Sequence, residues 1–408
     1  MTSPAPDALF AGLRVIDVAS YIAAPTAAMI LGDLGSDVIK IEPVGDGDPY
    51  RAIHDTPALP QSGTDHCWIT DSRSKRSLTL NLKADEGRAI MLKLVAGCDV
   101  FITNQPFPVR GRLRLGYEHL SPLNPRMIFA SLTAYGEQGP ERDRGAFDGV
   151  AYWGRSGLED LIRSRGSVPA PSAPGQGDHP TGVTLYAAIV TALYRRQLTG
   201  QGSHVHTSLL ANGFWSNACL GAAALAGADF EEWRSRPADR PGTFTRNVYE
   251  ASDGRFLQFL MARSDEEHEN ALRVAGLGKM LDDERFADAD SRWDNVLPII
   301  EAMTKAIGRR PATDWIESFE AAGVPCSLVR YTHEMGDDEQ AKINDVLIAP
   351  QTDDVGVPWI INHPVRVEGI AEAGAIRPPA VGEHTDEILD ELGYETEAID
   401  ALRRDGVV

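Results

Sequence analysis

The sequence predicts an α/β protein with a parallel sheet and a second, smaller α+β domain. Short β-branched apolar runs alternate with helical segments up to residue 224, and strands joined by helices form parallel sheets. Between residues 225 and 330 the pattern changes to a hairpin followed by helices. The 408 residues are enough for both domains. We therefore expect a large domain over 1–224, a small domain over 225–330 and a C-terminal segment, 331–408, that returns to the large domain.

The large domain opens with a strand–helix–strand unit. The run "LRVIDVA" (13–19) predicts a strand, "APTAAMILGDLG" (24–35) predicts a helix that ends at glycine, and "SDVIKIEP" (36–43) predicts a strand that ends at Pro43. Further strands are expected in "RSLTLNL" (76–82), "CDVFITN" (98–104), "PRMIFASLTAYG" (125–136) and "HVHTSLL" (204–210). Further helices are expected over 84–97 and from Thr181 to Leu198.

The small domain carries clear turn and cap signals. The segment "NVYEASDGRFLQFLM" (247–261) predicts a hairpin with Asp253-Gly254 at its turn. Ser264 followed by Glu267 has the spacing of a capping box and predicts a helix start. Helices are expected over 293–308 and 312–323, and a last helix over 385–393 belongs to the C-terminal segment.

Composition excludes several classes of protein. Apolar content of 43% and charged content of 24% are typical of a soluble globular chain. No run approaches the ~18 apolar residues of a membrane span, and the first twenty residues lack a secretory signal pattern. The four cysteines are far apart, which favours reduced thiols and a cytoplasmic location. A net charge of −20 argues against nucleic acid and anionic membranes as partners.

Common catalytic and cofactor motifs are missing. Glu42 ends a strand where a ribose-binding acid would lie, but the preceding loop has no GxGxxG for a dinucleotide. There is no GxSxG for a serine hydrolase, and His204 and His206 read as polar residues of a strand. No clustered ligands indicate a metal site.

Basic residues gather in the large domain against the acidic charge of the whole chain. They are Arg73, Lys75, Arg76, Lys83, Arg110, Arg112 and Arg114. In an extended segment the last three would lie on one side, where forked donors could bind phosphate. A solvated basic edge is the alternative interpretation.

Asp178 raises a question of its own. It lies in "GQGDHPTG" (175–182), two residues before the expected helix start at Pro180. One interpretation is structural, since an acid near a helix N-terminus accepts free N–H groups and interacts favourably with the helix dipole. The other is that the same donors hold a carboxylate ready to act as a nucleophile. The stretch alone leaves both open.

Several segments together resemble one family. These are "LGDLGSDVIKIEPVGDGDPYR" (31–51), "SKRSLTLNLK" (74–83), "FDGVAY" (147–152), "GDHPTG" (177–182), "LTGQGSHV" (198–205), "AAGVPCSLV" (321–329) and "GEHTDEILDELG" (382–393). In this order they resemble the class III CoA-transferases of the CaiB/BaiF or formyl-CoA transferase type. The resemblance implies a large Rossmann-like α/β domain, a small domain, and two subunits interlocked as a homodimer.

The resemblance also implies a reaction. CoA passes between an acyl-CoA thioester and a free carboxylic acid, and CoA is a substrate rather than a permanently bound cofactor. The family's nucleophile matches Asp178, which would form an acyl anhydride and then an aspartyl-CoA thioester. We expect helix N–H donors to keep Asp178 ionised at neutral pH. An acid in the "FDGVAY" motif, here Asp148, also belongs to the family's active site.

The family's CoA pocket maps onto residues scattered along the large domain. They are Ser20, Tyr21, Ala23, Leu80, Lys83, Asn104 and Arg114, with Arg112 as an alternative to Arg114. Ile22 stands where formyl-CoA transferases have glutamine, and Pro43 stands where they have arginine. The family's glycine run over the active site has no match either, which argues against oxalate and formyl-CoA as substrates.

An α-methylacyl-CoA racemase of the same fold is the alternative function. Racemases carry a histidine before the aspartate of the "FDGVAY" motif, where this chain has Phe147, and His179 is a chain neighbour of Asp178 rather than an opposing base. A catalytically inactive CoA-binding protein is a third possibility, weakened by the intact Asp178. Four arginines of a loop could bind a dicarboxylate, or could simply be solvated: Arg234, Arg236, Arg240 and Arg246.

Overall fold

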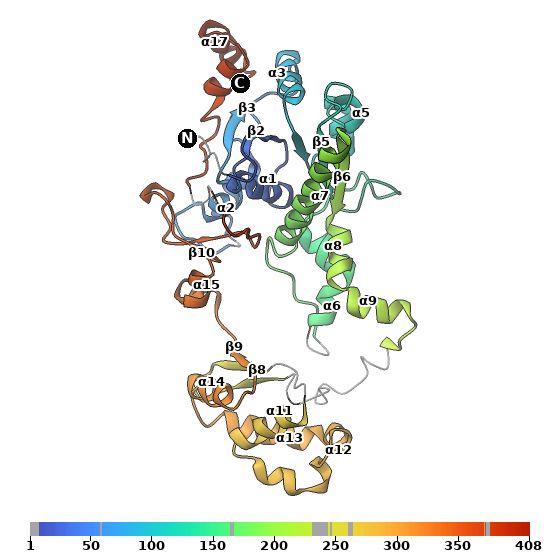
Figure 1. Ribbon diagram of the computed structural model, residues 1–408, viewed down its shortest axis with the longest axis vertical. Helices are drawn as coiled ribbons and strands as arrows, with labels where there is room; N and C mark the ends of the chain where they lie inside the picture. Colours follow the sequence, from blue (N-terminus) through green and yellow to red (C-terminus); the bar gives the residue numbers. More distant parts are fainter. Residues whose placement is uncertain are drawn as a thin grey trace. The chain divides into compact units, whose positions relative to one another are not determined.

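The computed structural model describes residues 8–57, 59–163, 167–230, 244, 247–259, 264–370, 372 and 376–408. The chain divides into two compact units (Figure 1). One unit contains Met1–Arg163, Val168–Ala226 and Glu339–Val408, and the other contains Ser164–Ser167 and Gly227–Asp338. We refer to them as the large unit and the small unit.

A six-stranded sheet forms the centre of the large unit. Its strands are β1 (Arg14–Asp17), β2 (Asp37–Glu42), β3 (Arg76–Thr79), β4 (Val100–Thr103), β5 (Ile128–Thr133) and β6 (Ser203–Ser208). All neighbours run parallel, in the order β3-β2-β1-β4-β5-β6, which confirms the expected α/β parallel sheet. The strand order reverses between β1 and β4, and ligands of open α/β sheets bind beyond the carboxyl ends at such a point.

Alternating strand residues face two separate cores. Val15 of β1 packs on the face covered by α1 (Ala23–Asp33) and α7 (Asp178–Thr199). Ile16, its neighbour, packs on the opposite face with α3 (Asp85–Ala96), α16 (Thr385–Glu391) and α17 (Thr396–Arg404). Both faces are therefore apolar, as a sheet covered on both sides requires.

Shorter elements complete the large unit. They are α2 (His66–Ser72), α4 (Phe107–Leu113), α5 (Tyr117–Leu120), α6 (Leu158–Ile162), α8 (Leu209–Ser216), α9 (Ala218–Leu225), α15 (Glu339–Ile343), β10 (Leu347–Ile348) and β11 (Ile360–Ile361). The large unit also contains the 3₁₀ helices η1 (Pro49–Asp55) and η7 (Asp353–Val355) and the π-helix η2 (Gly149–Gly154).

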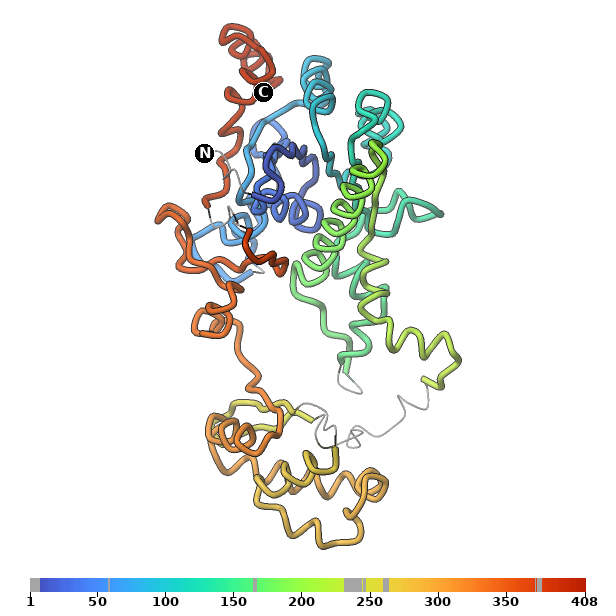
Figure 2. Tube along the Cα trace, viewed as in Figure 1, coloured from blue at the N-terminus to red at the C-terminus, as the bar shows by residue number. Residues whose placement is uncertain are grey.

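The C-terminal residues lie along the outer edge of β3. Ser77 of β3 exchanges two hydrogen bonds with His384, and the N–H of Asn81 donates to the carbonyl of Val407. Arg76 forms an ion pair with Glu391 of α16 at 2.6 Å. Figure 2 shows the red C-terminal trace beside the blue N-terminal part of the sheet. Residues far apart in sequence thus close one edge of the sheet.

The small unit has an antiparallel sheet and helices of its own. Strands β7 (Val248–Glu250), β8 (Phe256–Phe259) and β9 (Cys326–Leu328) lie in that order. Its α-helices are α11 (Asp265–Val274), α12 (Ala289–Asp294), α13 (Val296–Ile307) and α14 (Ala312–Ala321), and its 3₁₀ turns are η4 (Gly278–Asp282), η5 (Glu284–Phe286) and η6 (Thr332–Asp337). The pairing of β7 with β8 confirms the expected hairpin. Ser264 caps α11 by accepting the N–H of Glu267 at 3.2 Å, as its spacing predicts.

Candidate functional site

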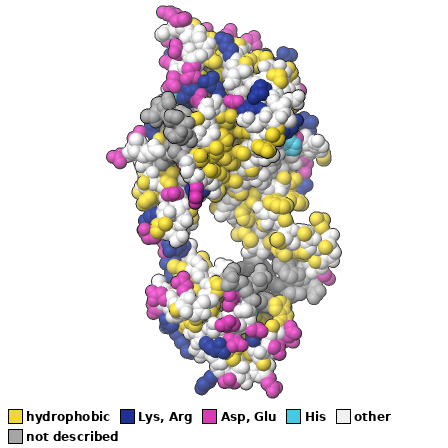
Figure 3. Space-filling model, viewed as in Figure 1, with side chains coloured by type: hydrophobic (Ala, Val, Ile, Leu, Met, Phe, Trp, Pro, Cys, Tyr) yellow, Lys and Arg dark blue, Asp and Glu magenta, His cyan; other side chains and the backbone are white. Residues whose placement is uncertain are grey.

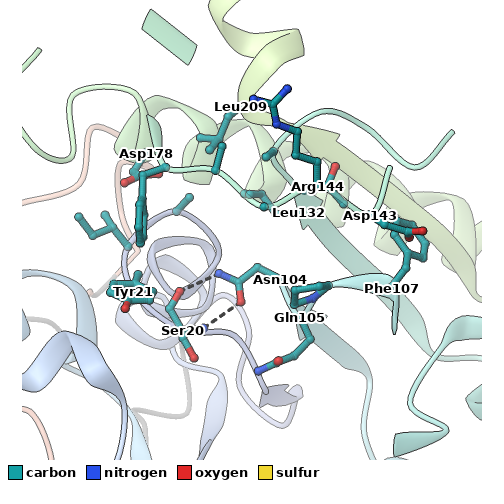
Figure 4. Close-up of a pocket in the computed structure, with 18 of the residues that line it drawn as sticks. Ser20, Tyr21, Asn104, Gln105, Phe107, Leu132, Asp143, Arg144, Asp178 and Leu209 are labelled. Atoms are coloured by element: carbon teal, nitrogen blue, oxygen red, sulfur yellow. Dashed lines mark hydrogen bonds between the residues drawn. The ribbon is translucent and has the colours of Figure 1, made fainter. Parts of the chain in front are cut away.

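Ser20 and Asn104 meet where the strand order of the sheet reverses. Ser20 follows β1, and Asn104 follows the adjacent β4. The N–H of Ser20 donates to Asn104 Oδ1 at 3.0 Å, and Asn104 Nδ2 donates to the carbonyl of Ser20 at 2.7 Å (Figure 4). The side-chain amide therefore satisfies both backbone groups of Ser20 and holds the loop after β1.

Two buried charged residues, Lys40 and Asp48, also bind this loop. Lys40 of β2 donates to the carbonyl of Ala19 and forms an ion pair with Asp48 at 2.8 Å. Asp48 Oδ1 in turn accepts the N–H of Tyr21 at 3.3 Å. Tyr21 adopts φ = 65°, a left-handed conformation that non-glycine residues adopt only where surrounding contacts impose it. The loop is therefore tied to the buried Lys40 of β2 and to Asp48 as well as to Asn104.

This loop lines a cavity of about 500 Å³ in the large unit. Figure 4 shows Asp178 near Tyr21, with Phe107 and Asp143 at the far end of the cavity. The cavity brings together five residues predicted from the sequence, namely Ser20, Tyr21, Ala23, Asn104 and Asp178. Its remaining lining residues are Ile22, Gln105, Pro106, Phe107, Leu132, Thr133, Ala134, Arg142, Asp143, Arg144, Gly145, Ala146, Phe147 and Leu209.

Asp178 is the first residue of α7 and does not cap it. Gly177 is the N-cap, and no side chain caps the helix at this position. Instead Asp148 Oδ2 accepts the N–H of Gly177 at 2.9 Å, while its Oδ1 accepts the N–H of Gly149 at 2.8 Å. The structural interpretation of Asp178 as the acceptor at the helix start is therefore wrong, because Asp148 has that role. The helix also begins earlier than its expected start.

Gly182 allows α7 to bring Asp178 against the loop. A Cβ atom at this position would lie 2.5 Å from the carbonyl oxygen of Ala23 and 2.8 Å from Cβ of Thr26, both in α1. Since those contacts are too short for any side chain, only glycine permits this approach. Thr181 donates its hydroxyl to the carbonyl of Gly177 at 2.7 Å. Thr181 and Gly182 thus fix the position of the helix start that carries Asp178.

Burial makes Asp178 a weak acid. Its side chain is almost fully enclosed, and this burial, together with the negative charges of Asp148 and Asp71, raises its pKa to about 7 although His179 opposes the shift. The expectation that helix donors keep Asp178 ionised at neutral pH is wrong. A carboxyl with this pKa is half protonated at pH 7 and becomes fully ionised only in mildly alkaline solution.

His179 is held by two acceptors. Its Nδ1 lies 3.0 Å from the carbonyl of Gly175, and its Nε2 lies 3.0 Å from Oδ1 of Asp71 in α2. Burial lowers the pKa of His179, but the hydrogen bond and charge of Asp71 outweigh burial and raise it to about 9. No pattern in the sequence points to Asp71, since "HCWITDS" contains no catalytic motif and lies about a hundred residues from His179.

A second cavity of about 420 Å³ adjoins the first. Ser20 and Gln105 line both cavities. Three predicted CoA-binding residues line the second one: Leu80, Lys83 and Arg112. Arg114 is not among the residues that line either cavity; it lies at the end of α4 in the left-handed conformation, with φ = 55°.

The other basic residues do not form a phosphate site. Arg110 and Arg112 lie on the helix α4 rather than on an extended segment, so the spacing-by-two argument fails. Arg110 is buried, donates to the carbonyl of Gln105 at 2.5 Å and pairs with Glu137 at 3.4 Å. Proline at the start of α4 and turn residues after it favour one short helix.

The three basic residues around β3, which are Arg73, Lys75 and Arg76, form ion pairs inside the large unit. Arg73 pairs with Asp33 at 2.9 Å, and Lys75 pairs with Asp17 at 3.0 Å, all fully buried. Arg76 pairs with acids of β2 and α16. Neither a phosphate site nor a solvated basic edge describes these residues, because their charges are already neutralised inside the large unit.

The arginines proposed to bind a dicarboxylate lie outside the described residues. They are Arg234, Arg236, Arg240 and Arg246. Among the described residues, no helix is long and apolar enough to cross a membrane.

Comparison with known proteins identifies the family. The model of CoA-transferase family III matches residues 10–385. The chain is 31% identical to (R)-2-hydroxy-4-methylpentanoate CoA-transferase of Clostridioides difficile, over 98% of this chain and 99% of that protein. It is 30% identical to cinnamoyl-CoA:phenyllactate CoA-transferase of Clostridium sporogenes, over 97% and 96%.

A solved structure agrees with these similarities. The crystal structure of a CaiB/BaiF family protein from Brucella suis superimposes with a TM-score of 0.81 at 26% identity, covering 95% of this chain and all of that one. The chain therefore belongs to CoA-transferase family III and is a CoA-transferase.

Proposed function

We propose that this enzyme moves CoA between an acyl-CoA thioester and a free carboxylic acid through covalent intermediates on Asp178. One observation carries the proposal: Asp178 is a buried carboxyl in the wall of a cavity, and its helix start is capped by Asp148 instead. A carboxyl that caps no helix is free to form and break bonds. Asp148 is then a positioning residue that fixes the residue before the nucleophile.

The chemistry proceeds in four displacements. The Asp178 carboxylate attacks the thioester carbonyl, the C–S bond breaks, and CoA thiolate leaves an acyl-aspartyl anhydride. The thiolate attacks the aspartyl carbonyl and releases the donor acid as its carboxylate, which leaves an aspartyl-CoA thioester. The acceptor carboxylate attacks this thioester to form a second anhydride. The thiolate then attacks the acceptor's carbonyl, which yields the new acyl-CoA and regenerates Asp178.

We assign different parts of the CoA molecule to the two cavities. Lys83 and Arg112 of the second cavity supply exposed positive charge for the nucleotide phosphates. Ser20 and Gln105, shared by both cavities, mark the passage for the thiol-bearing arm. The thioester then lies in the first cavity beside Asp178. Of the two arginines left open by the resemblance, Arg112 is the one we assign to CoA.

The lining of the first cavity favours an apolar acyl group. Its uncharged aliphatic and aromatic side chains include Ile22, Leu132, Ala134, Phe147 and Leu209. The two relatives described above are named for (R)-2-hydroxy-4-methylpentanoate and for cinnamoyl-CoA and phenyllactate. We therefore infer a monocarboxylic acid with a branched or aromatic apolar chain as substrate.

Neither Phe147 nor His179 fits the role of a racemase's second base. Phe147 lies 5.1 Å from the ring of Tyr21, edge to face, and has no proton to exchange. Both ring nitrogens of His179 are occupied by Gly175 and Asp71. Proton exchange at an α-carbon needs an acid and a base on opposite sides of the substrate.

Exposed apolar side chains support a homodimer. Trp215 of α8 is 81% exposed and Leu225 of α9 is 92% exposed, and Tyr194, Leu198 and Phe214 are also exposed. Figure 3 shows apolar side chains gathered on the face of the large unit. Patches of this kind mark interfaces. We infer that a second copy of this chain covers it, interlocked as the family resemblance implies; light scattering over a dilution series tests the dimer.

Trapping tests the covalent mechanism. With a donor acyl-CoA and no acceptor acid, the enzyme should carry CoA as a thioester, which borohydride reduces to an alcohol. Peptide mapping should find homoserine in place of Asp178. The Asp178→Asn variant should bind CoA yet give no adduct and no transfer. A trapped adduct on Asp148, or full transfer by Asp178→Ala, would contradict the proposal.

A further inference from the structure

The hydrogen bonds of His179 define its charge. Its Nδ1 lies 3.0 Å from a carbonyl oxygen, that of Gly175, and its Nε2 lies 3.0 Å from a carboxylate oxygen of Asp71. A carbonyl oxygen can only accept a hydrogen bond, and so can an ionised carboxylate. Both ring nitrogens must therefore donate, and an imidazole that donates from both nitrogens is a cation.

Asp71 is surrounded by hydrogen-bond donors. It is completely buried in α2. Its Oδ2 accepts the hydroxyl of Tyr50 at 2.8 Å, and its Oδ1 lies 3.1 Å from the hydroxyl of Thr26. Donors thus come from η1, α1 and α7, so three separate elements fix this one carboxylate. Such a group is rigid enough to set both the position and the protonation of His179.

We propose that Asp71 is a positioning residue that holds a protonated His179 beside Asp178, so that the positive charge of His179 increases the fraction of Asp178 that is ionised and able to attack the thioester. The proposal rests on the proposed role of Asp178 as nucleophile. His179 follows Asp178 directly in α7, and its charge acts on the Asp178 carboxyl, whose pKa it lowers.

The charges around Asp178 explain why such a pair is needed. In the described part of the chain, the charged groups that act on Asp178 are Asp148 before η2, Asp71 in α2 and His179 in α7. Burial and both acids favour the protonated form, and His179 alone favours the ionised form. A nucleophile enclosed among carboxylates would otherwise be mostly protonated and inert near neutral pH.

The test is the pH dependence of adduct formation in a single turnover. Formation of the borohydride-trapped adduct on Asp178 is measured from pH 5.5 to pH 9.5 for the wild type, Asp71→Asn and His179→Gln. We expect the acid limb to move up by about one pH unit in His179→Gln, a roughly tenfold slower rate at pH 6, because the ionised fraction falls tenfold per unit below its midpoint. In Asp71→Asn the limb should move up by less, because this change also removes a negative charge that raises the pKa of Asp178.

Two further variants separate electrostatics from structure. His179→Lys should return the limb toward the wild-type position, since it restores a positive charge. Asp65→Asn makes the same change at the N-cap of α2, beside His54 instead of His179, and should leave the limb in place. Equal slowing at every pH, or an unmoved limb in Asp71→Asn and His179→Gln, would overturn the inference. Absence of a wild-type adduct on Asp178 would instead refute the proposed function.

Discussion

Asp148 accepts the N–H of Gly177 at 2.9 Å, across 29 residues of sequence, and so caps the helix that begins with Asp178. Asp148 accepts the N–H group at the helix start, so Asp178 is not needed as its acceptor. The two carboxylates are close enough for the charge of Asp148 to help raise the pKa of Asp178 to about 7. This division of roles between two neighbouring acids underlies the first predictions.

Removing the charge of Asp148 should shift the pH profile of transfer. In Asp148→Asn the pKa of Asp178 should fall below 7, because a source of negative charge is lost while burial remains. The amide of this variant keeps one acceptor oxygen for the N–H groups of Gly149 and Gly177, so activity should fall somewhat at pH 8. It should fall less at pH 6, because more of Asp178 is then ionised than in the wild type. The measurement is kcat/KM against pH. Asp143→Asn, at the far end of the cavity, should leave the profile unchanged.

Replacing Asp178 should stabilise the protein in alkaline solution. Folding raises the pKa of this carboxyl from 3.8 to about 7, so the folded state loses stability as the pH rises between those values. Asp178→Asn removes that loss. Urea denaturation should show little difference between the proteins near pH 4.5 and a gain for the variant above pH 7, at most roughly 4 kcal/mol. Asp46→Asn, in an exposed turn, should show no such pH-dependent gain.

CoA affinity should distinguish the two arginines of the α4 region. Lys83→Ala and Arg112→Ala should each weaken CoA binding about tenfold, since each removes a charged donor from the second cavity. Arg114→Ala is the matched control and should bind CoA like the wild type, because its side chain lines neither cavity. Calorimetry measures all three. A loss confined to Arg114→Ala would mean that the phosphates bind elsewhere.

Phe147 should set the preference for the acyl group. It is 60% exposed and lines the first cavity, so Phe147→Ala should lower kcat/KM for a branched or aromatic acid several-fold while affecting acetate little. Leu123→Ala, exposed but lining neither cavity, serves as the control. Competition between acids read by mass spectrometry gives the ratio directly. Preference of the wild type for succinate over these acids would contradict the apolar assignment.

Gly182→Ala should destabilise the large unit by about 1–3 kcal/mol, since a Cβ would overlap the carbonyl oxygen of Ala23. Gly221→Ala is a matched control in helix α9, where a Cβ meets nothing within 4 Å, and should be neutral or slightly stabilising. Thermal unfolding measures both. Equal melting temperatures for both variants would show that α7 can move away from α1 at little cost.

Patterns local in sequence predicted much of this fold. Apolar runs such as "LRVIDVA" and "CDVFITN" contain strands β1 and β4, and their parallel pairing follows from the helices between them. The meeting of Ser20 and Asn104 depends on the pairing of β1 with β4, and the order of the strands was not predicted from the sequence. Only the family resemblance assigned both residues to one pocket.

Contacts between distant segments could not be predicted in the same way. Nothing in "HCWITDS" indicates that Asp71 reaches His179, and nothing local shows that Asp148 rather than Asp178 accepts the helix N–H. The ionisation of Asp178 depends on burial, which is a property of the assembled unit. Spacing misled for Arg110 and Arg112, because a two-residue repeat has meaning only in a strand and these residues lie on a helix.

The large unit is discontinuous in the chain, and this affects how it is made in the cell. The outer edge of β3 receives its partners from residues around His384 and Val407, about 300 residues after the strand itself. A ribosome adding about 5–20 residues per second needs roughly 15–60 s to reach them. During that interval the strand edge can pair with other nascent chains. The yield on expression should therefore be higher when nascent chains rarely meet during that interval. A chaperone that covers the edge until translation is complete should have the same effect.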